Sequence, residues 1–382
     1  MWDKCLVVLF LSFMTISCSS NSSEIDESTL SSSSLDSSNS LGDAIIHEWV
    51  SYLQSSDQGL WEESANSILF YRNDGPFIDE ELPEPAIYRP YAVCSFEDTV
   101  YVTDTAKYQI VALDGNGSVL WKAGGEGEGP GHFTMMTSLA VSKNYIAALN
   151  YAQSRIEFFN KDGSFSHSTG FVGAEDIVAI SDSLFAVASS MEHGGDIHIL
   201  DPNDGVLSSF GEVETIHYAN IPRSDLLRLC SGPNGILCLY NRYEGLLAIY
   251  DIYTKECLFR GSRNYPASPE PPREERNSSG ETRMAFFPIG GNTFVGPDGM
   301  LNVVICNLME DGSFISDPEY LDFAPITAID RYDWEGNYLD SYCLPDSCIN
   351  YVTCLPDGRI IGRNFAEGTL REFSQRPYSE VN

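Results

Sequence analysis

A repeat that lacks its final piece constrains the fold of this chain more than any other feature. In five copies, a strand-like run ends in Asp or Asn, turns within a few residues and continues into a second strand. These copies lie at residues 112–121, 158–166, 199–208, 249–259 and 331–340. A sixth first half, Thr369–Phe373, has no second half, and a lone strand-like run, Ser67–Tyr71, precedes the first copy. A ring of sheets whose last sheet is completed by the N-terminal run accounts for both loose pieces and leaves no exposed edge.

A second hairpin precedes each copy and adds two strands to each sheet. A tight turn, such as the one at Pro297, Asp298 and Gly299, leads into an apolar strand that ends in a small polar residue. These strands cover residues 100–104, 146–150, 184–189, 236–241, 301–307 and 360–364. Two hairpins per repeat predict an all-β fold: a six-bladed β-propeller of four-stranded antiparallel blades, with the last blade closed by an N-terminal strand.

The polar residues that end these second strands form a matched set with two interpretations. The set comprises Asp104, Asn150, Ser189, Asn241, Asn307 and Asn364. Their side chains either surround the mouth of the central channel or bond to nearby backbone groups. The second interpretation is favoured, because Asn, Asp and Ser commonly make such bonds at strand ends.

The start of the chain has the pattern of an export signal. Lys4 precedes an apolar run at residues 6–16, which is too short to cross a bilayer as a helix and is typical of a signal peptide. The run ends at Thr15-Ile16-Ser17-Cys18, which resembles a bacterial lipobox, although Thr15 stands where Leu is usual. We therefore expect a lipoprotein signal peptide at residues 1–17 and lipidation of Cys18. The alternative is an ordinary secreted protein with a polar leader.

Composition divides the rest of the chain into three parts. Residues 18–42 are Ser-rich and nearly devoid of apolar side chains, which predicts a disordered tether. Residues 43–65 show helical spacing of Ile45, Trp49 and Leu53, which predicts a short helical lead-in. Residues 66–382 hold the propeller. With the lipid anchor, this order predicts a location in the bacterial cell envelope, periplasmic or outer-membrane facing.

The charge balance excludes one class of partner. The formal net charge is −33, whereas a protein that binds nucleic acid needs a basic surface. Such a charge favours a strongly solvated exterior and leaves room for cationic partners. We therefore expect no nucleic acid partner.

The cysteines give one candidate disulfide and no metal site. Cys343 and Cys348 flank the turn Leu-Pro-Asp-Ser and could be bridged in an oxidising compartment. The alternative is a set of free, buried thiols, because most of the other cysteines fall inside apolar strand runs. Their spacing fits no zinc template, and the sequence predicts neither a metal nor another cofactor.

Three segments of the first blade resemble a known repeat. Gly124–Phe133 resembles the junction between blades in NHL-type propellers, and residues 100–104 and 109–114 resemble the second and third strands of that repeat. The full motif occurs only in this blade. Together with the lipobox, the chain resembles the six-bladed β-propeller lipoproteins of Bacteroidetes-type bacteria. That family has no general assigned activity, so the resemblance implies a fold and a location but no reaction.

Long connections all open on one face of the predicted ring, which indicates where function lies. Connections from strand two to three and from strand four to the next blade carry the insertions, and long loops in compact domains are commonly functional. Candidate ligand contacts, expected to be exposed loop residues, are Tyr151, Arg155, His193, Arg242, Tyr243, Arg363 and Asn364.

Two functions from different classes remain open. The first is a binding module for a protein, peptide or glycan. The second is a hydrolase or lyase with a polar or metal site at the channel mouth. Only His132 and His193 could supply imidazole at that mouth, and no catalytic residue can be named, so the sequence favours binding.

Substitution of the lipobox cysteine tests the anchor. Cys18→Ser should release the protein from membranes or leave it unprocessed, because a serine accepts no thioether-linked lipid. Fractionation of cells and the mass of the mature protein check this. Unchanged membrane association together with unchanged mass would contradict the lipoprotein interpretation.

Overall fold

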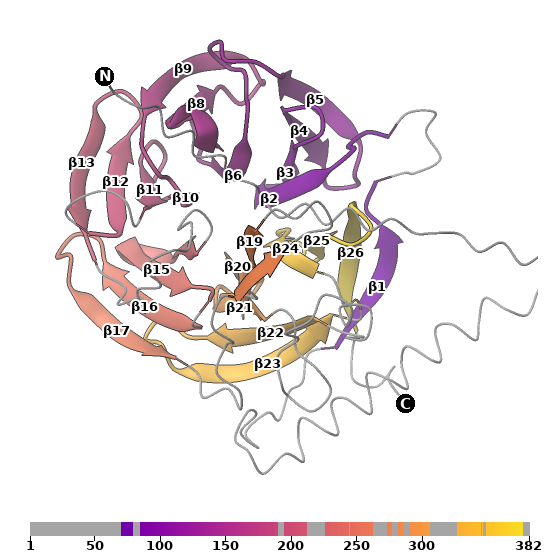
Figure 1. Cartoon of the computed structure of the whole chain (residues 1–382). Helices are drawn as coiled ribbons and strands as arrows, with labels where there is room; N and C mark the ends of the chain where they lie inside the picture. Colours follow the sequence, from indigo (N-terminus) through magenta and orange to yellow (C-terminus); the bar gives the residue numbers. More distant parts are fainter. Residues whose placement is uncertain are drawn as a thin grey trace, which may run out of the picture.

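The computed structural model is a ring of six β-sheet blades around a central channel (Figure 1). It describes residues 70–78, 85–189, 195–211, 226–243, 245–262, 273–276, 282–285, 290–305, 327–344, 346 and 349–376. The expected six-bladed all-β propeller is confirmed.

Each blade is a four-stranded antiparallel sheet whose strands follow the chain from the channel outward, except in blade 6. Blade 1 holds β2 (Pro90–Phe96), β3 (Thr99–Asp104), β4 (Gln109–Asp114) and β5 (Val119–Gly124). Blade 2 holds β6 (Met136–Val141), β7 (Ile146–Asn150), β8 (Arg155–Phe159) and β9 (Phe165–Gly170). Blade 3 holds β10 (Asp176–Ala179), β11 (Phe185–Ala188), β12 (Ile197–Asp201) and β13 (Gly205–Phe210).

The second half of the ring repeats this plan. Blade 4 holds β14 (Leu227–Ser231), β15 (Ile236–Asn241), β16 (Leu246–Asp251) and β17 (Cys257–Ser262). Blade 5 holds β20 (Gly290–Val295), β21 (Leu301–Ile305), β22 (Thr327–Tyr332) and β23 (Tyr338–Leu344). Blade 6 holds β24 (Ile349–Cys354), β25 (Ile360–Asn364), β26 (Thr369–Arg376) and β1 (Phe70–Pro76). A separate hairpin of β18 (Arg273–Arg276) and β19 (Thr282–Ala285) lies between blades 4 and 5 in the sequence.

The N-terminal strand closes the ring as the sequence predicts. β1 pairs antiparallel with β26, from Phe70 opposite Arg376 to Pro76 opposite Arg371, and forms the outer strand of blade 6 (Figure 1). Its first residue also meets β23 of blade 5 in parallel register. The strand is placed a few residues later than expected, because pairing runs on to Pro76. The outer strand of the last blade is therefore supplied from the opposite end of the chain.

Side chains of successive residues pack into different interfaces, which explains why the strands are almost wholly apolar. Val100 and Val102 of β3 pack between blades 6 and 1, whereas Tyr101 packs between blades 1 and 2. Each gap between neighbouring blades holds one such buried cluster. A strand alternates its side chains between two sheet faces, and in this ring both faces are covered. The alternation of apolar and polar residues seen in one-sided sheets is accordingly weak here.

The Asp and Asn residues of the repeat shape the turns between strands three and four. The carboxylate of Asp114 accepts hydrogen bonds from the backbone amides of Asn116 and Ser118, both at 2.9 Å. Asp333 receives the equivalent bonds from Glu335 and Asn337. A short side chain with a free acceptor mimics a backbone turn in this way. The repeat visible in the sequence is thus a repeated turn, and the predicted hairpin at Asp114 is confirmed.

Several sequence predictions fall outside the described residues. The signal peptide at 1–17, the tether at 18–42, the helical lead-in at 43–65 and the lipidation of Cys18 are among them, as is the partner thiol Cys348 of the expected disulfide. These remain predictions. Five cysteines in the described part of the chain are free thiols, namely Cys94, Cys230, Cys238, Cys257 and Cys354.

Closure by β1 can be tested at a single buried ring. Tyr71 is 3% exposed and packs against Phe373 and Tyr342, the latter with ring centroids 4.9 Å apart. Tyr71→Ala should lower the free energy of unfolding by about 3 kcal/mol, because truncating a large buried side chain leaves a cavity. Arg72→Ala, an exposed change in the same strand, is the matched control and should cost about 0.5 kcal/mol or less. Chemical unfolding of both variants measures this, and equal stability of the two would contradict closure by β1.

Candidate functional site

The central channel is lined by the first strand of every blade. These inner strands, β2, β6, β10, β14, β20 and β24, contact one another around the full ring. The C-terminal residues of all six strands line a single cavity of about 490 Å³. The six inner strands therefore run in the same direction. Their N-terminal ends therefore lie on the face that carries the long connections, and their C-terminal ends lie on the face of short turns.

Above this cavity, toward the face of long connections, the channel is crossed by polar side chains. The residue just before each lining run lies one position nearer to that face, and in four strands it is polar. We name Ser138, Asp176, Arg228 and Tyr351 the polar layer. They come from blades 2, 3, 4 and 6, and three of them are no more than 6% exposed while Asp176 is 9% exposed. The polar layer thus joins four of the six blades at the axis.

Hydrogen bonds connect the members of the polar layer in pairs. The guanidinium Nη2 of Arg228 donates to the hydroxyl of Tyr351 at 2.8 Å, which links blade 4 to blade 6 across the channel. Asp176 accepts from the hydroxyl of Ser138 at 2.5 Å and from the backbone amide of Leu229 at 2.8 Å. Blades 2, 3 and 4 are linked by this one carboxylate.

Electrostatics explain why a carboxyl group and a guanidinium share this buried layer. Burial raises the pKa of Asp176, while the nearby charge of Arg228 and the bonds from Ser138 and Leu229 lower it. A buried charge without compensation is costly, and an opposite charge with hydrogen bonds offsets much of that cost. Arg228 therefore opposes the effect of burial and favours the ionised form of Asp176.

Side chains also fasten neighbouring inner strands to one another. Both groups of the Asn292 amide bond to the backbone of Val352, at 2.8 Å in each direction, and so join β20 to β24. The hydroxyl of Thr293 donates to the carbonyl of Leu229 and joins β20 to β14. The hydroxyl of Ser95 donates to the carbonyl of Cys354 and joins β2 to β24. Inner strands have an unpaired backbone edge toward the channel, and these contacts satisfy part of it.

Arg363 lies between blades 6 and 1, near the face of long connections. Its guanidinium stacks at 5.0 Å from the ring centre of Tyr91 and 6.0 Å from that of Tyr351. One nitrogen donates to the amide oxygen of Asn350 at 3.3 Å. The side chain is half-buried, and the two rings fix the plane of its guanidinium.

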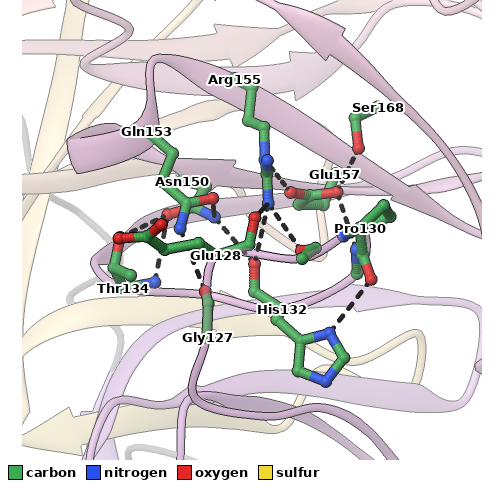
Figure 2. A network of polar contacts seen from close by, with 12 residues as sticks. Gly127, Glu128, Pro130, His132, Thr134, Asn150, Gln153, Arg155, Glu157 and Ser168 are labelled. Carbon is green, nitrogen blue, oxygen red and sulfur yellow. Dashed lines mark hydrogen bonds and ion pairs between the residues drawn. The ribbon is translucent and has the colours of Figure 1, made fainter.

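Arg155 lies elsewhere, in a network beneath the glycine-rich junction of blades 1 and 2 (Figure 2). Its Nη2 donates to the carbonyl of Gly129 at 2.7 Å and to that of Glu128 at 3.1 Å, and its Nε pairs with Glu157. The Glu157 side chain is fully buried and also accepts from the backbone amide of Gly131. Two side chains of blade 2 thus hold the loop that precedes β6.

Asn150 and Gln153 also hold the loop that precedes β6. The amide nitrogen of Asn150 donates to the carbonyl of His132 at 2.9 Å, and that of Gln153 donates to the carbonyl of Gly127 at 3.0 Å (Figure 2). The glycine-rich run is therefore a junction held by backbone contacts.

Other members of the strand-end polar set also bond to the segment that leads into their own blade. Asp104 is fully buried and accepts from the backbone amides of Tyr88 and Arg89. Asn364 donates to Asp346 at 2.9 Å and accepts from the amides of Ala366 and Glu367. The backbone-bonding interpretation describes these residues, whereas Asn307 lies outside the described ones. Asn364 remains a predicted ligand contact, and its side-chain amide already makes the three hydrogen bonds named above.

We expected Arg242 and Tyr243 to be exposed loop residues, but both are buried. They are 6% and 3% exposed, and Arg242 donates from Nε to the carbonyl of Gly290 at 2.9 Å. Expecting exposed loop residues there was wrong, since this turn lies under the start of blade 5. Tyr151 begins a short 3-10 turn at Tyr151–Gln153 and is partly exposed, whereas His193 lies outside the described residues.

The predicted ligand contacts do not gather at one described point. Arg155 belongs to the junction of blades 1 and 2, Arg242 to the turn before blade 5, and Arg363 to the gap between blades 6 and 1. None of the three lines the 490 Å³ cavity. Arg242 contacts the start of the inner strand β20, and Arg363 contacts Asn350 and Tyr351 of the inner strand β24.

Sequence reasoning missed the polar layer. A charged residue inside an apolar inner strand was the available signal, because Arg228 interrupts the run Leu227, Leu229 and Cys230. Asp176 likewise opens an apolar run. A strand with both faces buried admits a charge only where its edge meets another polar group. That rule could have named Arg228 and Asp176, but it could not have named their partners.

Comparison with known proteins agrees with this architecture. Residues 84–172 match a protein family described as 6-bladed beta-propeller. The chain is a six-bladed β-propeller. It resembles the solved structure of a DUF4221 family member from Bacteroides vulgatus, with 11% identity and a TM-score of 0.53 over 81% of this chain and 98% of that one. It also resembles a protein of Bacteroides fragilis named as exported, with 14% identity and a TM-score of 0.50 over 82% and 96%.

At such identities, likeness extends to the fold alone. The resemblance to six-bladed propellers of Bacteroidetes-type bacteria is confirmed at that level, and its lipoprotein part stays a prediction. No curated protein matches the chain. In the part of the chain that the structure describes, no cluster of three or more His, Cys, Asp or Glu side chains could hold a metal ion. Within the same ranges, no helix is long and apolar enough to cross a membrane.

The polar layer predicts a stability loss that depends on pH. Arg228→Met should lower the free energy of unfolding by about 3 kcal/mol at pH 7, because it removes the positive charge that favours the ionised form of the buried Asp176. The same substitution should raise the already elevated pKa of Asp176 further. A carboxyl whose folded pKa lies above its unfolded value contributes stability at low pH and loses it as pH rises through the folded pKa. The loss should therefore be smaller at pH 4 than at pH 7.

Urea unfolding of Arg228→Met at both pH values measures this difference. The double variant Asp176→Asn with Arg228→Met is the matched control, and it should lose much of the pH dependence because the titrating group is gone. An equal loss for the single variant at both pH values would contradict the coupling of Arg228 to Asp176.

Proposed function

We propose that this protein is an exported binding module, anchored to the cell envelope through a lipid on Cys18, which presents the face of long connections to a protein, peptide or glycan. The observation that carries the proposal is the stacked position of Arg363 beside the channel. The anchor rests on the lipobox and on the Ser-rich segment that follows it. A likeness in fold to a Bacteroides protein named as exported is consistent with this location.

The chemistry of Arg363 suits recognition of an acidic group. A guanidinium offers a planar fork that matches a carboxylate or phosphate, and stacking on rings fixes the plane of that fork. The contacts with Tyr91, Tyr351 and Asn350 hold the plane of the group before any ligand arrives. A side chain that is ordered in advance loses less entropy on binding.

The net charge of −33 limits how such a ligand would be bound. An anionic partner is repelled by the protein as a whole, so a local base must supply the attraction. Tyrosine rings beside Arg363 add apolar area with a polar tip, as protein, peptide and glycan sites commonly do. A partner with one acidic group on an uncharged body fits these conditions better than a polyanion does.

The alternative is a hydrolase or lyase that uses a polar site at the channel mouth. The polar layer places a carboxyl group, a guanidinium and a phenol near the axis, but all three are buried and already engaged: the guanidinium donates to the phenol, and the carboxyl group accepts from Ser138 and from the amide of Leu229. That arrangement favours a structural use of these groups. Conversion of a bound compound into product would support the hydrolase or lyase alternative.

A screen with a matched pair of arginine variants tests the binding proposal. Glycan arrays and a library of acidic and neutral peptides are probed with the wild-type protein, Arg363→Ala and Arg72→Ala. Loss of Arg363 should weaken binding of an acidic hit by at least about fivefold, because anchor residues cost more than about 1 kcal/mol when truncated. Arg72 lies on the outer strand of blade 6 and its loss should leave binding unchanged.

Melting temperatures of both variants must match the wild type, so that weakened binding reflects the contact. A hit that binds Arg363→Ala as tightly as the wild type would place the ligand elsewhere and overturn this assignment. Cleavage of a hit during incubation would overturn the binding role in favour of the enzyme.

A further inference from the structure

The cavity at the short-turn end of the channel lies opposite the face assigned to the partner above. Residues of all six inner strands line it, at positions 93–97, 139–141, 177–179, 229–231, 292–297 and 352–356. Its volume of about 490 Å³ lies in the range of small-molecule sites, which is roughly 300–1,000 Å³. It is therefore large enough for a compact organic ligand.

Apolar side chains and neutral thiols make up part of the wall. Phe96, Val178 and Val295 line the cavity from three blades and are not fully buried, so they offer hydrocarbon surface to it. Cys94 and Cys354 also line the cavity, and burial raises the pKa of each thiol to about 12. A thiol that stays protonated behaves as a small apolar group. The wall thus suits an apolar body.

The mouth of the cavity has negative charge. Glu97 is the only charged side chain among the described residues that line it. The short turns around it carry four more carboxylates next to the lining runs. Three of them form ion pairs, Asp182 with Lys143, Asp298 with Arg331 and Asp357 with Arg359, so Asp98 is the one that adds to the charge of Glu97. Anions are disfavoured at such a mouth, and cations are attracted to it.

Basic side chains at this end are mostly neutralised by contacts of their own. Lys143 pairs with Asp182 at 3.5 Å, and Arg359 pairs with Asp357 at 2.7 Å and with Glu372 at 3.1 Å. Lys161, the base whose charge acts on Glu97, has its ammonium 4.1 Å from the ring centre of Phe96 and donates to the carbonyl of Ser142. An ammonium group of the chain itself therefore already lies on an aromatic ring at this rim.

The polar layer sets the depth that a ligand can reach. The charge of Arg228 acts on Asp176 there, so the inner end of the cavity offers a cation no carboxyl group that is free of a neighbouring positive charge. A cationic group gains nothing by moving inward and loses hydration if it does. Its favourable position is the acidic mouth, with the apolar part pointing toward the polar layer.

We propose that this cavity binds a small amphiphilic organic amine, with its apolar body among the inner strands and its ammonium group at the mouth beside Glu97. This site is separate from the partner face, and neither depends on the other. Binding requires no movement of the inner strands, because the space is present between them. The charge of the ligand sets its orientation, and the fit of its body sets its affinity.

Three compounds with one body and different charge test the proposal. 4-Phenylbutylamine, 4-phenylbutanol and 4-phenylbutyrate are titrated by calorimetry and ligand-observed NMR into the full chain carrying Cys18→Ser, which avoids detergent. The amine should bind at least about tenfold more tightly than the carboxylate, with the alcohol between them. Added salt should narrow this difference, because screening weakens attraction at an exposed mouth.

Two substitutions locate the binding. Ser231 is half-buried and lines the cavity, so Ser231→Trp should fill the space and abolish binding of the amine. Glu97→Gln should weaken amine binding by about threefold to tenfold and leave the alcohol unaffected. Glu256→Gln removes one charge from an outer turn of the same face and is the matched control, with no expected effect.

Binding of the amine to a folded Ser231→Trp variant with wild-type affinity would overturn the proposal. So would equal affinity for amine and carboxylate, or absence of binding to the wild type. If Ser231→Trp fails to fold, the comparison of Glu97→Gln with Glu256→Gln decides, and equal effects of the two would reject the site.

Discussion

Pairing of β1 with β26 is the interaction on which the rest of the structure depends. Six blades can surround a channel only if the last one joins the first, and blade 6 takes its outer strand from the opposite end of the chain. The pairing converts a row of sheets into a ring without exposed ends. Tyr71 then enters the buried cluster between blades 5 and 6, so backbone closure and side-chain packing reinforce one another. Loss of this strand would expose both an edge of blade 6 and part of that cluster.

In a closed ring, the inner strands have a backbone edge toward the axis that no neighbouring strand pairs with. Inner strands turn unpaired backbone groups toward the axis, where solvent is restricted and unsatisfied groups are costly. Polar side chains satisfy some of these groups by bonding to the backbone of the next blade, as Asn292, Thr293 and Ser95 do. Asp176 accepts from the backbone amide of Leu229 in the same way, and Arg228 opposes the rise in its pKa that burial causes. The polar layer is a consequence of closure and of the edge that closure leaves at the axis.

Local signals made the architecture predictable. Asp114 and its equivalents mark turns because their carboxylates cap the backbone, and that chemistry acts within four residues. The loose first and last strands then fixed the mode of closure. The site was less predictable, because its contacts join residues far apart in the chain, such as Arg228 and Tyr351. Arg242 shows the same limit: its sequence indicates an exposed turn, whereas in the ring it is buried and donates to the carbonyl of Gly290 in blade 5.

The two ends of the channel differ in chemistry, and the polar layer is the boundary between them. Toward the long connections, Arg363 presents a fixed guanidinium; toward the short turns, Glu97 borders an apolar cavity. Groups of opposite charge can therefore be attracted at opposite ends of one ring, although the protein as a whole is strongly acidic. Tyr351 belongs to both regions, because its ring lies in the stack with Tyr91 while its hydroxyl accepts from Arg228. A change at Tyr351 would therefore disturb the channel itself, whereas changes at Arg363 or Glu97 act on one end only.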